Sequence, residues 1–295
     1  MNDRKLKVFY EVATKLNMTE VSQKLYISQP AVSQTIQELE RELNLKLFDR
    51  IGRKLFLTHE GDIFLGYVRR ILNIYDEAVD TLRDNNSLEN GKMKIGASTT
   101  IGIYILPEVI GKFIKNYKNI DVSIAIENTK IISDMIVNNE IDFALVEGPI
   151  YEQDIKINSF CEDELVIITS MDHLWTKNPM IDIHEIGKEK IIMRENGSGT
   201  REVFENILIT NNVKYNMAFQ LGNTEAIKKA VEAGLGISCI SYRCVKDEVK
   251  LGKINVVKIK DINIKREFSL IYHRDKYLSK LITTFIDFAK KEIDK

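Results

Sequence analysis

Residues 27–36 read Ile-Ser-Gln-Pro-Ala-Val-Ser-Gln-Thr-Ile (ISQPAVSQTI), and this stretch decides the fold of the N-terminal part. Ser28 can cap a helix, and Pro30 is tolerated in a first turn, whose amides have no acceptor within the helix. After the proline, apolar residues step by four, three and four, at Val32, Ile36, Leu39 and Leu43. This spacing predicts a helix with one face in a core and a small, polar, nearly uncharged face outside.

Two shorter helices are predicted before it. Apolar residues recur at helical spacing between residues 6 and 16, which predicts the first helix. Asn17 can cap the second, with Glu20 three positions later as in a capping box. Two short helices, a tight turn and a third helix with small hydrogen-bonding side chains form a helix-turn-helix, which enters the major groove of DNA. An ordinary solvated helix face is the competing explanation.

A basic hairpin is predicted after the third helix. Strands expected at residues 45–48 and 55–58 flank the turn at 49–54. Such a wing would place its basic side chains against the phosphate backbone or in the minor groove. Glutamine can bond adenine bidentately, and serine can reach a phosphate or a base edge. The candidate DNA-binding residues are Thr19, Ser28, Gln29, Pro30, Ala31, Ser33, Gln34, Gln37, Arg50, Arg53 and Lys54.

The composition limits the function classes. The chain has 295 residues and a formal net charge of −1, which predicts two or more domains and allows only a local contact with nucleic acid. No apolar run reaches the roughly 18 residues of a membrane span, and no signal peptide is apparent, so a cytoplasmic protein with no membrane partner is expected. Cys161, Cys239 and Cys244 lack CxxC spacing and are expected to be buried thiols, with a redox role as the alternative.

A long helix is predicted from Thr58 or His59, with an apolar seam of about six turns. Packing against its own domain is one explanation of this seam, but the DNA-binding unit is too small to cover it. An antiparallel dimerisation helix is therefore the preferred interpretation. The polar, turn-rich segment from Asp84 to Gly91 predicts a hinge.

From Lys92 onward, strand-like and helix-like runs alternate, which predicts an α/β sheet with ligands beyond the carboxyl ends of its strands. Hydroxyl and amide side chains follow several strands, where helix N-termini would favour a small oxyanion or carboxylate. These residue types are also the ordinary N-cap residues, so capping competes with ligand binding at each position. Strands are expected near residues 92–97, 121–126, 141–146, 164–169, 190–194, 217–221, 236–241 and 267–272.

The segment from Asn17 to Gly61 resembles the winged helix-turn-helix of LysR-type transcriptional regulators. This chain departs from the family with Val21-Ser22 in place of the usual alanine pair, and with Gln34 where arginine is frequent. The resemblance rests on Thr19, Leu25, SQPAVS at 28–33, Ile36, LE at 39–40, LFDR at 47–50 and LTHEG at 57–61.

The resemblance implies a mostly α winged helix-turn-helix domain, a long linker helix and a two-lobed α/β effector domain like a periplasmic binding protein. The DNA-binding domain would span residues 1–58, the dimerisation helix and hinge 59–90, and the effector domain 91–295. Lobe I would comprise about 91–162 and 267–295, and lobe II about 163–266.

Four strings resemble the branch of this family that regulates sulfur assimilation and responds to sulfite or related small anions. They are STTIG at 98–102, VEGP at 146–149, RENGSGTRE at 194–202 and NTEAIKKAVEAGLGI at 223–237. The candidate effector-binding residues are Ser98, Thr99, Thr100, Asn128, Glu147, Arg194, Ser198, Thr200 and Thr224. Glu147 would repel an anion unless it points away, and Arg194 would supply charge or brace its loop. The expected effector is a small anion or small carboxylate such as sulfite, and no obligatory cofactor is expected.

These features predict a regulator that binds double-stranded promoter DNA as a dimer or homotetramer, with RNA polymerase as a candidate partner. Effector binding would shift the lobes and change DNA bending. An α/β enzyme with an accessory DNA-binding domain is the alternative, and a free-standing transport receptor is disfavoured because no export signal is apparent. No metal site is expected, because the four histidines, His59, His173, His184 and His273, lack metal-ligand spacing. No phosphate-loop or dinucleotide motif is visible either.

Overall fold

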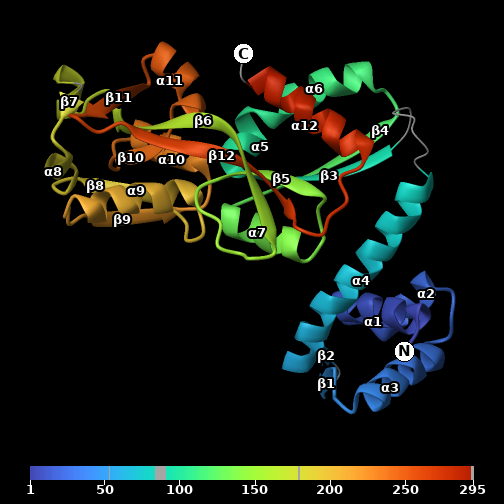
Figure 1. Cartoon of the computed structure of the whole chain (residues 1–295). Coiled ribbons are helices and arrows are strands. Elements are labelled where there is room, and N and C mark those ends of the chain that lie inside the picture. Colours follow the sequence, from blue (N-terminus) through green and yellow to red (C-terminus); the bar gives the residue numbers. More distant parts are fainter. Residues whose placement is uncertain (53, 84–90, 179, 294–295) are drawn as a thin grey trace. The chain divides into compact units, whose positions relative to one another are not determined.

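The structure is a computed structural model that describes residues 1–52, 54–83, 91–178 and 180–293. The chain divides into two compact units. The first begins at the N-terminus and ends with a long helix, and the second is described from residue 91 onward (Figure 1).

Three helices form the core of the first unit: α1 (Asp3–Lys15), α2 (Met18–Lys24) and α3 (Gln29–Leu43). The predicted caps are present, because the side chain of Asn17 accepts the amides of Thr19 and Glu20, and that of Ser28 accepts the amide of Ala31. The apolar faces of the three helices meet at completely buried side chains, among them Phe9, Val12, Val21, Val32 and Leu39.

The predicted wing is a tighter hairpin than the sequence suggested, formed by β1 (Phe48–Ile51) and β2 (Lys54–Leu57). Ile51 pairs with Lys54, so only two residues connect the strands. The first of them, Gly52, has a φ of +65°, a backbone conformation that glycine adopts without steric cost. The buried carboxylate of Glu40 accepts the amides of Leu47 and Phe48 at 2.9 and 3.3 Å and so fixes the start of the hairpin to α3.

The long helix α4 (His59–Arg83) begins where it was predicted and spans 25 residues. Leu65 and Val68 face the core of the first unit and are buried. A second set of apolar residues on α4 is 44% to 63% exposed: Ile63, Tyr67, Ile71, Ile74 and Tyr75. The segment predicted as a hinge, residues 84–90, lies outside the described residues.

The second unit is built on a mixed β-sheet. Its strands are β3 (Gly91–Ser98), β4 (Ile120–Glu127), β5 (Phe143–Glu147), β6 (Ile155–Ser170), β7 (Met180–Ile181), β11 (Ile254–Ile259) and β12 (Ile264–His273). Their order is β4-β3-β5-β12-β6-β11-β7, and β10 (Ser238–Ser241) pairs with β6 off this path. A separate parallel pair consists of β8 (Lys190–Arg194) and β9 (Asn216–Leu221).

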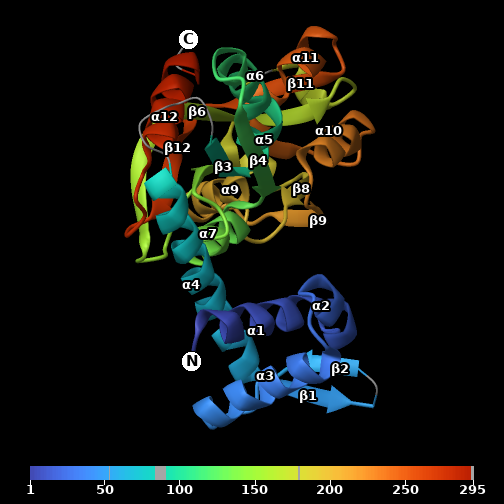
Figure 2. The same cartoon turned by 90° about the vertical axis from the view of Figure 1, so that its right-hand side faces the viewer.

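Helices cover these sheets. They are α5 (Thr99–Tyr104), α6 (Leu106–Asn116), α7 (Thr129–Val137), η1 (Leu174–Lys177), α8 (Ile183–Ile186), α9 (Gly199–Thr210), α10 (Thr224–Glu232), η2 (Tyr242–Cys244), α11 (Lys246–Lys250) and α12 (Lys280–Ile293). The C-terminal helix α12 packs beside α6 (Figure 2). The rings of Phe285 and Phe113 meet edge-on between them, with their centroids 5.0 Å apart.

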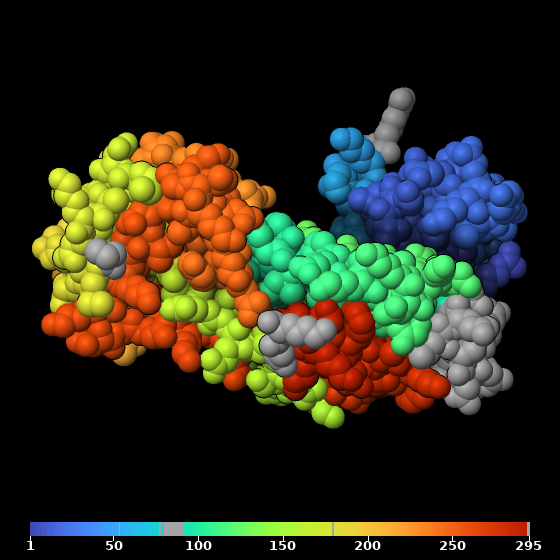
Figure 3. Space-filling view, turned by 90° about the horizontal axis from the view of Figure 1, so that it is seen from above, coloured from blue at the N-terminus to red at the C-terminus, as the bar shows by residue number. Residues whose placement is uncertain are grey.

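The buried apolar clusters of this unit fall into two lobes. Lobe I draws its core from residues 93–160 and 268–293, and lobe II from residues 165–264. The two lobes lie end to end, with lobe I in green and red and lobe II in yellow to orange (Figure 3). The two-lobed α/β fold behind an N-terminal winged helix-turn-helix is confirmed.

Two long antiparallel strands connect the lobes. From Ile155 to Leu165, β6 pairs with β12, and beyond that point it pairs with β10 and β11. The register between β6 and β12 shifts between Phe268 and Ser269, which is the signature of a β-bulge. The predicted strand at 164–169 was therefore too short, and the prediction missed β7 and β11. Among the described residues, no helix combines the length and the apolarity that crossing a bilayer requires.

Candidate functional site

Most of the predicted DNA-binding side chains are exposed to solvent. Gln34 is engaged, because its amide nitrogen donates to the carboxylate of Glu38 at 3.0 Å. Arg50 on the wing lies against the start of α2, where its Nη2 is 3.6 Å from the sulfur of Met18. Thr19, Ser28, Gln29, Pro30, Gln34, Gln37, Arg50 and Lys54 are exposed, Ala31 and Ser33 are half-buried, and Arg53 lies outside the described residues.

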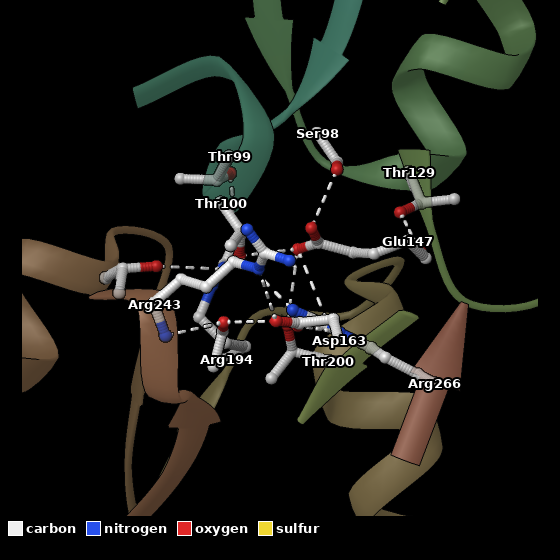
Figure 4. A network of polar contacts seen from close by, with 12 residues as sticks. Ser98, Thr99, Thr100, Thr129, Glu147, Asp163, Arg194, Thr200, Arg243 and Arg266 are labelled. Carbon is white, nitrogen blue, oxygen red and sulfur yellow. Dashed lines mark hydrogen bonds and ion pairs between the residues drawn. The ribbon is translucent and has the colours of Figure 1, made fainter. Parts of the chain in front are cut away.

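Most of the predicted effector-binding residues meet in one polar cluster where the two lobes come together (Figure 4). The cluster includes the ends of β3 and β5 and the start of α5 from lobe I, and the end of β8 and the starts of α9 and α10 from lobe II. These positions follow strands, as an α/β fold requires of a ligand site. Its predicted members are nearly inaccessible to solvent: Ser98, Thr99, Thr100, Glu147, Arg194, Thr200 and Thr224 are at most 8% exposed.

Glu147 is the centre of the first half of this cluster. Its carboxylate accepts hydrogen bonds from the hydroxyls of Ser98 and Thr100, both at 2.9 Å, and from Thr200 at 3.3 Å. Glu147 does not point away from the cluster, which was the condition under which it would not repel an anion. It points inward because three hydroxyl donors from both lobes solvate its buried charge, as a buried carboxylate requires.

Glu147 lies beside a buried ion pair that the sequence did not predict. Arg266 lies on β12 directly opposite Asp163 on β6, and its Nε donates to the Asp163 carboxylate at 2.7 Å. Its Nη1 donates to the Thr200 hydroxyl at 2.8 Å and lies 3.6 Å from Glu147. Burial alone would lower the pKa of the Arg266 guanidinium, but the charges of Glu147 and Asp163 outweigh burial and raise this pKa.

Asp163 also receives partners from lobe II. The hydroxyl of Ser241 donates to it at 2.7 Å, and the Nε of Arg243 lies at 3.5 Å. The pattern of β12 could have revealed Arg266, because strand alternation places it on the same face as the buried residues Ile264 and Phe268.

Arg194 is the centre of the second half. Its guanidinium donates to the hydroxyls of Thr99 at 3.1 Å and Thr224 at 3.2 Å, and its Nε donates to the carboxylate of Glu195 at 2.8 Å. Arg194 therefore bridges the lobes, since Thr99 belongs to lobe I and the others to lobe II. Burial would raise the pKa of Glu195, but the hydrogen bond and charge of Arg194 outweigh burial and lower it below its ordinary value.

The remaining two predicted residues lie at helix starts. Asn128 is half-buried, and its side-chain oxygen accepts the amide of Ile131 at 3.0 Å, so it caps α7. Its side chain also hydrogen-bonds to Glu195, the partner of Arg194. Ser198 is 3% exposed and occupies the N-cap position of α9. Its hydroxyl makes no capping bond and has no hydrogen-bond partner among the described residues. Thr129, the residue after Asn128, donates to the backbone carbonyl of Glu147 at 2.6 Å.

Glycines allow the lobes to approach closely beside this cluster. A β-carbon on Gly199 would lie 1.8 Å from the carbonyl oxygen of Glu147, and one on Gly148 would lie 2.5 Å from the α-carbon of Gly199. The amide of Lys130 in lobe I donates to the carbonyl of Gly197 in lobe II at 3.2 Å. The structure therefore shows the lobes in backbone contact.

Of the three cysteines that were expected to be buried, Cys161 is only half-buried. Among the described residues, neither the two buried thiols nor a cluster of metal-ligating side chains forms a second candidate site. Cys239 and Cys244 are buried, and burial raises the pKa of the Cys244 thiol to about 12 and that of Cys239 in the same direction. Their reactive thiolate forms are therefore disfavoured. Among the residues that the structure describes, no group of three or more His, Cys, Asp and Glu side chains is placed to hold a metal ion.

Comparison with known proteins identifies the family. Residues 4–62 match the model of the bacterial regulatory helix-turn-helix protein, lysR family, and residues 86–294 match the LysR substrate binding domain. The chain belongs to the LysR family of transcriptional regulators. It is 34% identical to the uncharacterized HTH-type transcriptional regulator YeiE of Escherichia coli K12, over 97% of this chain and 96% of that protein.

Two solved structures are similar to parts or all of this LysR-family regulator. The regulatory domain of CcmR from Synechocystis PCC6803, in complex with 2-PG, is 32% identical, with a TM-score of 0.65 over 69% of this chain and 97% of that one. Full-length CbnR complexed with its target DNA has a TM-score of 0.72 at 20% identity, over 99% of each chain, and shows the shared fold. These comparisons do not place the chain in the sulfur-assimilation branch, which stays a prediction.

Proposed function

We propose that this LysR-family regulator binds a small anionic effector between lobes I and II and that the bound effector changes how the protein holds its promoter DNA. The observation that carries the proposal is the buried polar cluster where the lobes meet. It joins both lobes through side chains that a small acid could also engage. The similar CcmR regulatory domain was solved in complex with 2-PG, which supports a small-molecule effector for this chain too.

We assign a separate task to each part of the chain. We assign DNA binding to residues 1–58, dimerisation and the hinge to 59–90, and effector binding to 91–295, with the lobe boundaries expected from the sequence. A regulatory rather than an enzymatic role is proposed because residues 4–62 match a bacterial regulatory helix-turn-helix protein and residues 86–294 match the substrate binding domain of the same family. We assign this work to the cytoplasm, where promoter DNA lies.

The DNA-binding surface would be the first turns of α3 together with the wing. Here Gln29 and Pro30 are exposed beside the cap Ser28, and small side chains permit close approach to base edges. CbnR was solved with its target DNA, which supports the same use of this shared fold.

The DNA assignment is tested by binding DNA from upstream of the gene, measured by fluorescence anisotropy. Gln29→Ala should weaken specific binding by about tenfold, because one bidentate base contact contributes about 1–3 kcal/mol. Gln23→Ala is the matched control, since Gln23 is exposed on α2 outside the candidate surface. Equal loss in both variants, or no loss in either, would contradict the assignment.

The effector assignment is tested by thermal shift and calorimetry of the full-length protein with small acids, including phosphate, sulfite, propionate and lactate. At least one should bind the wild type, and Ser198→Ala should weaken that binding, because the variant removes a buried hydroxyl that has no partner in the described part of the chain. The acid that binds should also change the affinity for the DNA. The proposal fails if no acid binds, or if binding leaves DNA affinity unchanged.

A further inference from the structure

The hydroxyl groups around Glu147 already donate their hydrogen bonds to its carboxylate. A hydroxyl has a single proton to donate, and Ser98, Thr100 and Thr200 all direct theirs to the Glu147 carboxylate. The same three side chains were predicted to bind an anion. A bare oxyanion in their place would have to displace these hydrogen bonds from Glu147. It would also lie beside a buried carboxylate whose charge Arg266 offsets only in part, because that guanidinium is shared with Asp163, so electrostatic repulsion opposes it. The Glu147 carboxylate thus occupies the position expected for an external anion.

The start of α9 is different, because the side chain at its N-cap position makes no hydrogen bond within the described part of the chain. Two neighbouring helices are capped: Asn128 accepts an amide of α7, and Asn223 accepts the amides of Glu225 and Ala226 on α10. The short helix α5 has no side-chain cap, but the hydroxyl of its N-cap residue, Ser98, is bonded to Glu147. At α9, a helix of 12 residues, Ser198 makes no capping bond. Its hydroxyl is buried without a partner in the described part of the chain. A helix start that has no side-chain cap and a buried, unbonded hydroxyl suits an anionic group.

The start of α9 lies next to Glu147. Gly199, the residue after Ser198, is in contact with the backbone of Glu147, since a β-carbon there would come within 1.8 Å of the Glu147 carbonyl oxygen. A carboxylate can accept about four hydrogen bonds, and three hydroxyls use the one at Glu147. One acceptor position of the Glu147 carboxylate therefore remains beside the start of α9, where the Ser198 hydroxyl is buried without a partner among the described residues.

From this geometry we propose that the effector is a small acid with a hydrogen-bond donor beside its anionic group, such as a 2-hydroxy or 2-amino acid, rather than a bare oxyanion. This inference rests on the effector site proposed above. The anionic group binds the start of α9 and the hydroxyl of Ser198, and the adjacent hydroxyl or ammonium donates to Glu147. Glu147 is then the residue that determines specificity, because it accepts the donor and repels acids that have none.

The test compares matched acids on the full-length protein. Lactate and propionate carry the same carboxylate, and only lactate has a hydroxyl on the adjacent carbon. Dissociation constants are measured by calorimetry at constant ionic strength. Lactate should bind the wild type about tenfold more tightly than propionate, which corresponds to about 1.4 kcal/mol. This comparison needs no mutation, so it does not depend on whether a variant folds.

Glu147→Gln extends the test. The substitution removes the repelling charge and leaves an amide, so the ratio of lactate to propionate affinity should fall toward one, chiefly through tighter propionate binding. Glu162→Gln is the matched control, because Glu162 is an exposed carboxylate that pairs with Lys265 outside the cluster, and it should keep the wild-type ratio. Circular dichroism and the unfolding midpoint show whether each variant is folded.

The outcomes separate this inference from the proposed function. Equal wild-type affinities for lactate and propionate, or a ratio that survives Glu147→Gln, would overturn the donor requirement. Tight binding of phosphate or sulfite that Ser198→Ala weakens would also overturn it, while leaving the effector site in place. If neither acid of the pair and no oxyanion binds, both the effector site and this inference fail.

Discussion

At Gly199, the addition of one carbon would bring a side chain into the backbone of the opposite lobe. We expect Gly199→Ala to lower the free energy of unfolding of the effector unit by about 1–3 kcal/mol, as overpacking does, because the clash is with the Glu147 carbonyl and the Gly148 α-carbon rather than with a flexible side chain. Chemical denaturation measures this change.

Gly111→Ala provides the control, because a β-carbon at Gly111 meets nothing within 4 Å and the position is inside α6. This variant should gain about 0.5–1 kcal/mol from helix propensity. A Gly199→Ala protein as stable as the wild type would show that the lobes separate at no energetic cost.

Glu195 should make the stability of the effector domain depend on pH in the acidic range. Its pKa in the folded protein lies below the ordinary value of 4.5, so its pairing with Arg194 stabilises the fold above that value and is lost as the pH falls through the lowered pKa. The difference in unfolding free energy between wild type and Glu195→Gln should therefore be largest near about pH 6–7 and shrink below about pH 4. Denaturation at a series of pH values measures it, and a difference independent of pH would refute the pairing.

Single residues also mark how far the sequence could predict the site. Hydroxyl residues after strands were recognisable, and the structure brings most of them together. The inward position of Glu147 was not, because it depends on partners from three separate elements. Asp163 lies between Glu162 and Glu164 and reads as part of a solvated charge run. Only the pairing of β6 with β12 places it opposite Arg266.

At the scale of elements, the N-cap residues of two helices in lobe II differ in whether they cap their helix. The side chain of Asn223 accepts two amides of α10, whereas Ser198 accepts none of α9. Asn223→Ala should therefore cost about 1 kcal/mol of stability, and Ser198→Ala clearly less, under about 0.5 kcal/mol. Thermal and chemical unfolding of the two variants measure the contrast. Equal costs would mean that Ser198 caps its helix in solution and is not reserved for a ligand.

Helices were predicted more accurately than strands, for physical reasons. The apolar periodicity and the capping residues of α1 to α3 are local features, so they can be recognised from the sequence. The short strand β11 forms because it pairs with β6, and such tertiary pairing overrides a weak local signal. The wing was correctly placed, but its loop was drawn too long, because residues 49–51 and 54 read as turn while the register of the hairpin extends them into strands.

For the whole molecule, we expect α4 to hold two copies together through its exposed apolar residues. Ile71 and Ile74 are 44% and 49% exposed, and the double variant Ile71→Glu/Ile74→Glu should weaken dimerisation by more than about tenfold, because charged side chains would be buried unpaired. Sedimentation velocity over a concentration series measures this. Leu16→Glu, an exposed apolar residue outside α4, should leave the dimer intact. Unaltered association in the double variant would place the contact between copies elsewhere.

The lobes are joined by the paired strands β6 and β12, and this limits the mechanical output of the effector domain. A two-stranded ribbon twists with little resistance, but sliding one strand along the other would break its ladder of hydrogen bonds and invert its faces. Relative motion of the lobes should therefore be a rotation about the ribbon, with the bulge near Phe268 as the most compliant point. Different ligands would then set the angle of one shared torsional movement, and the axis of that movement would be a fixed property of the chain.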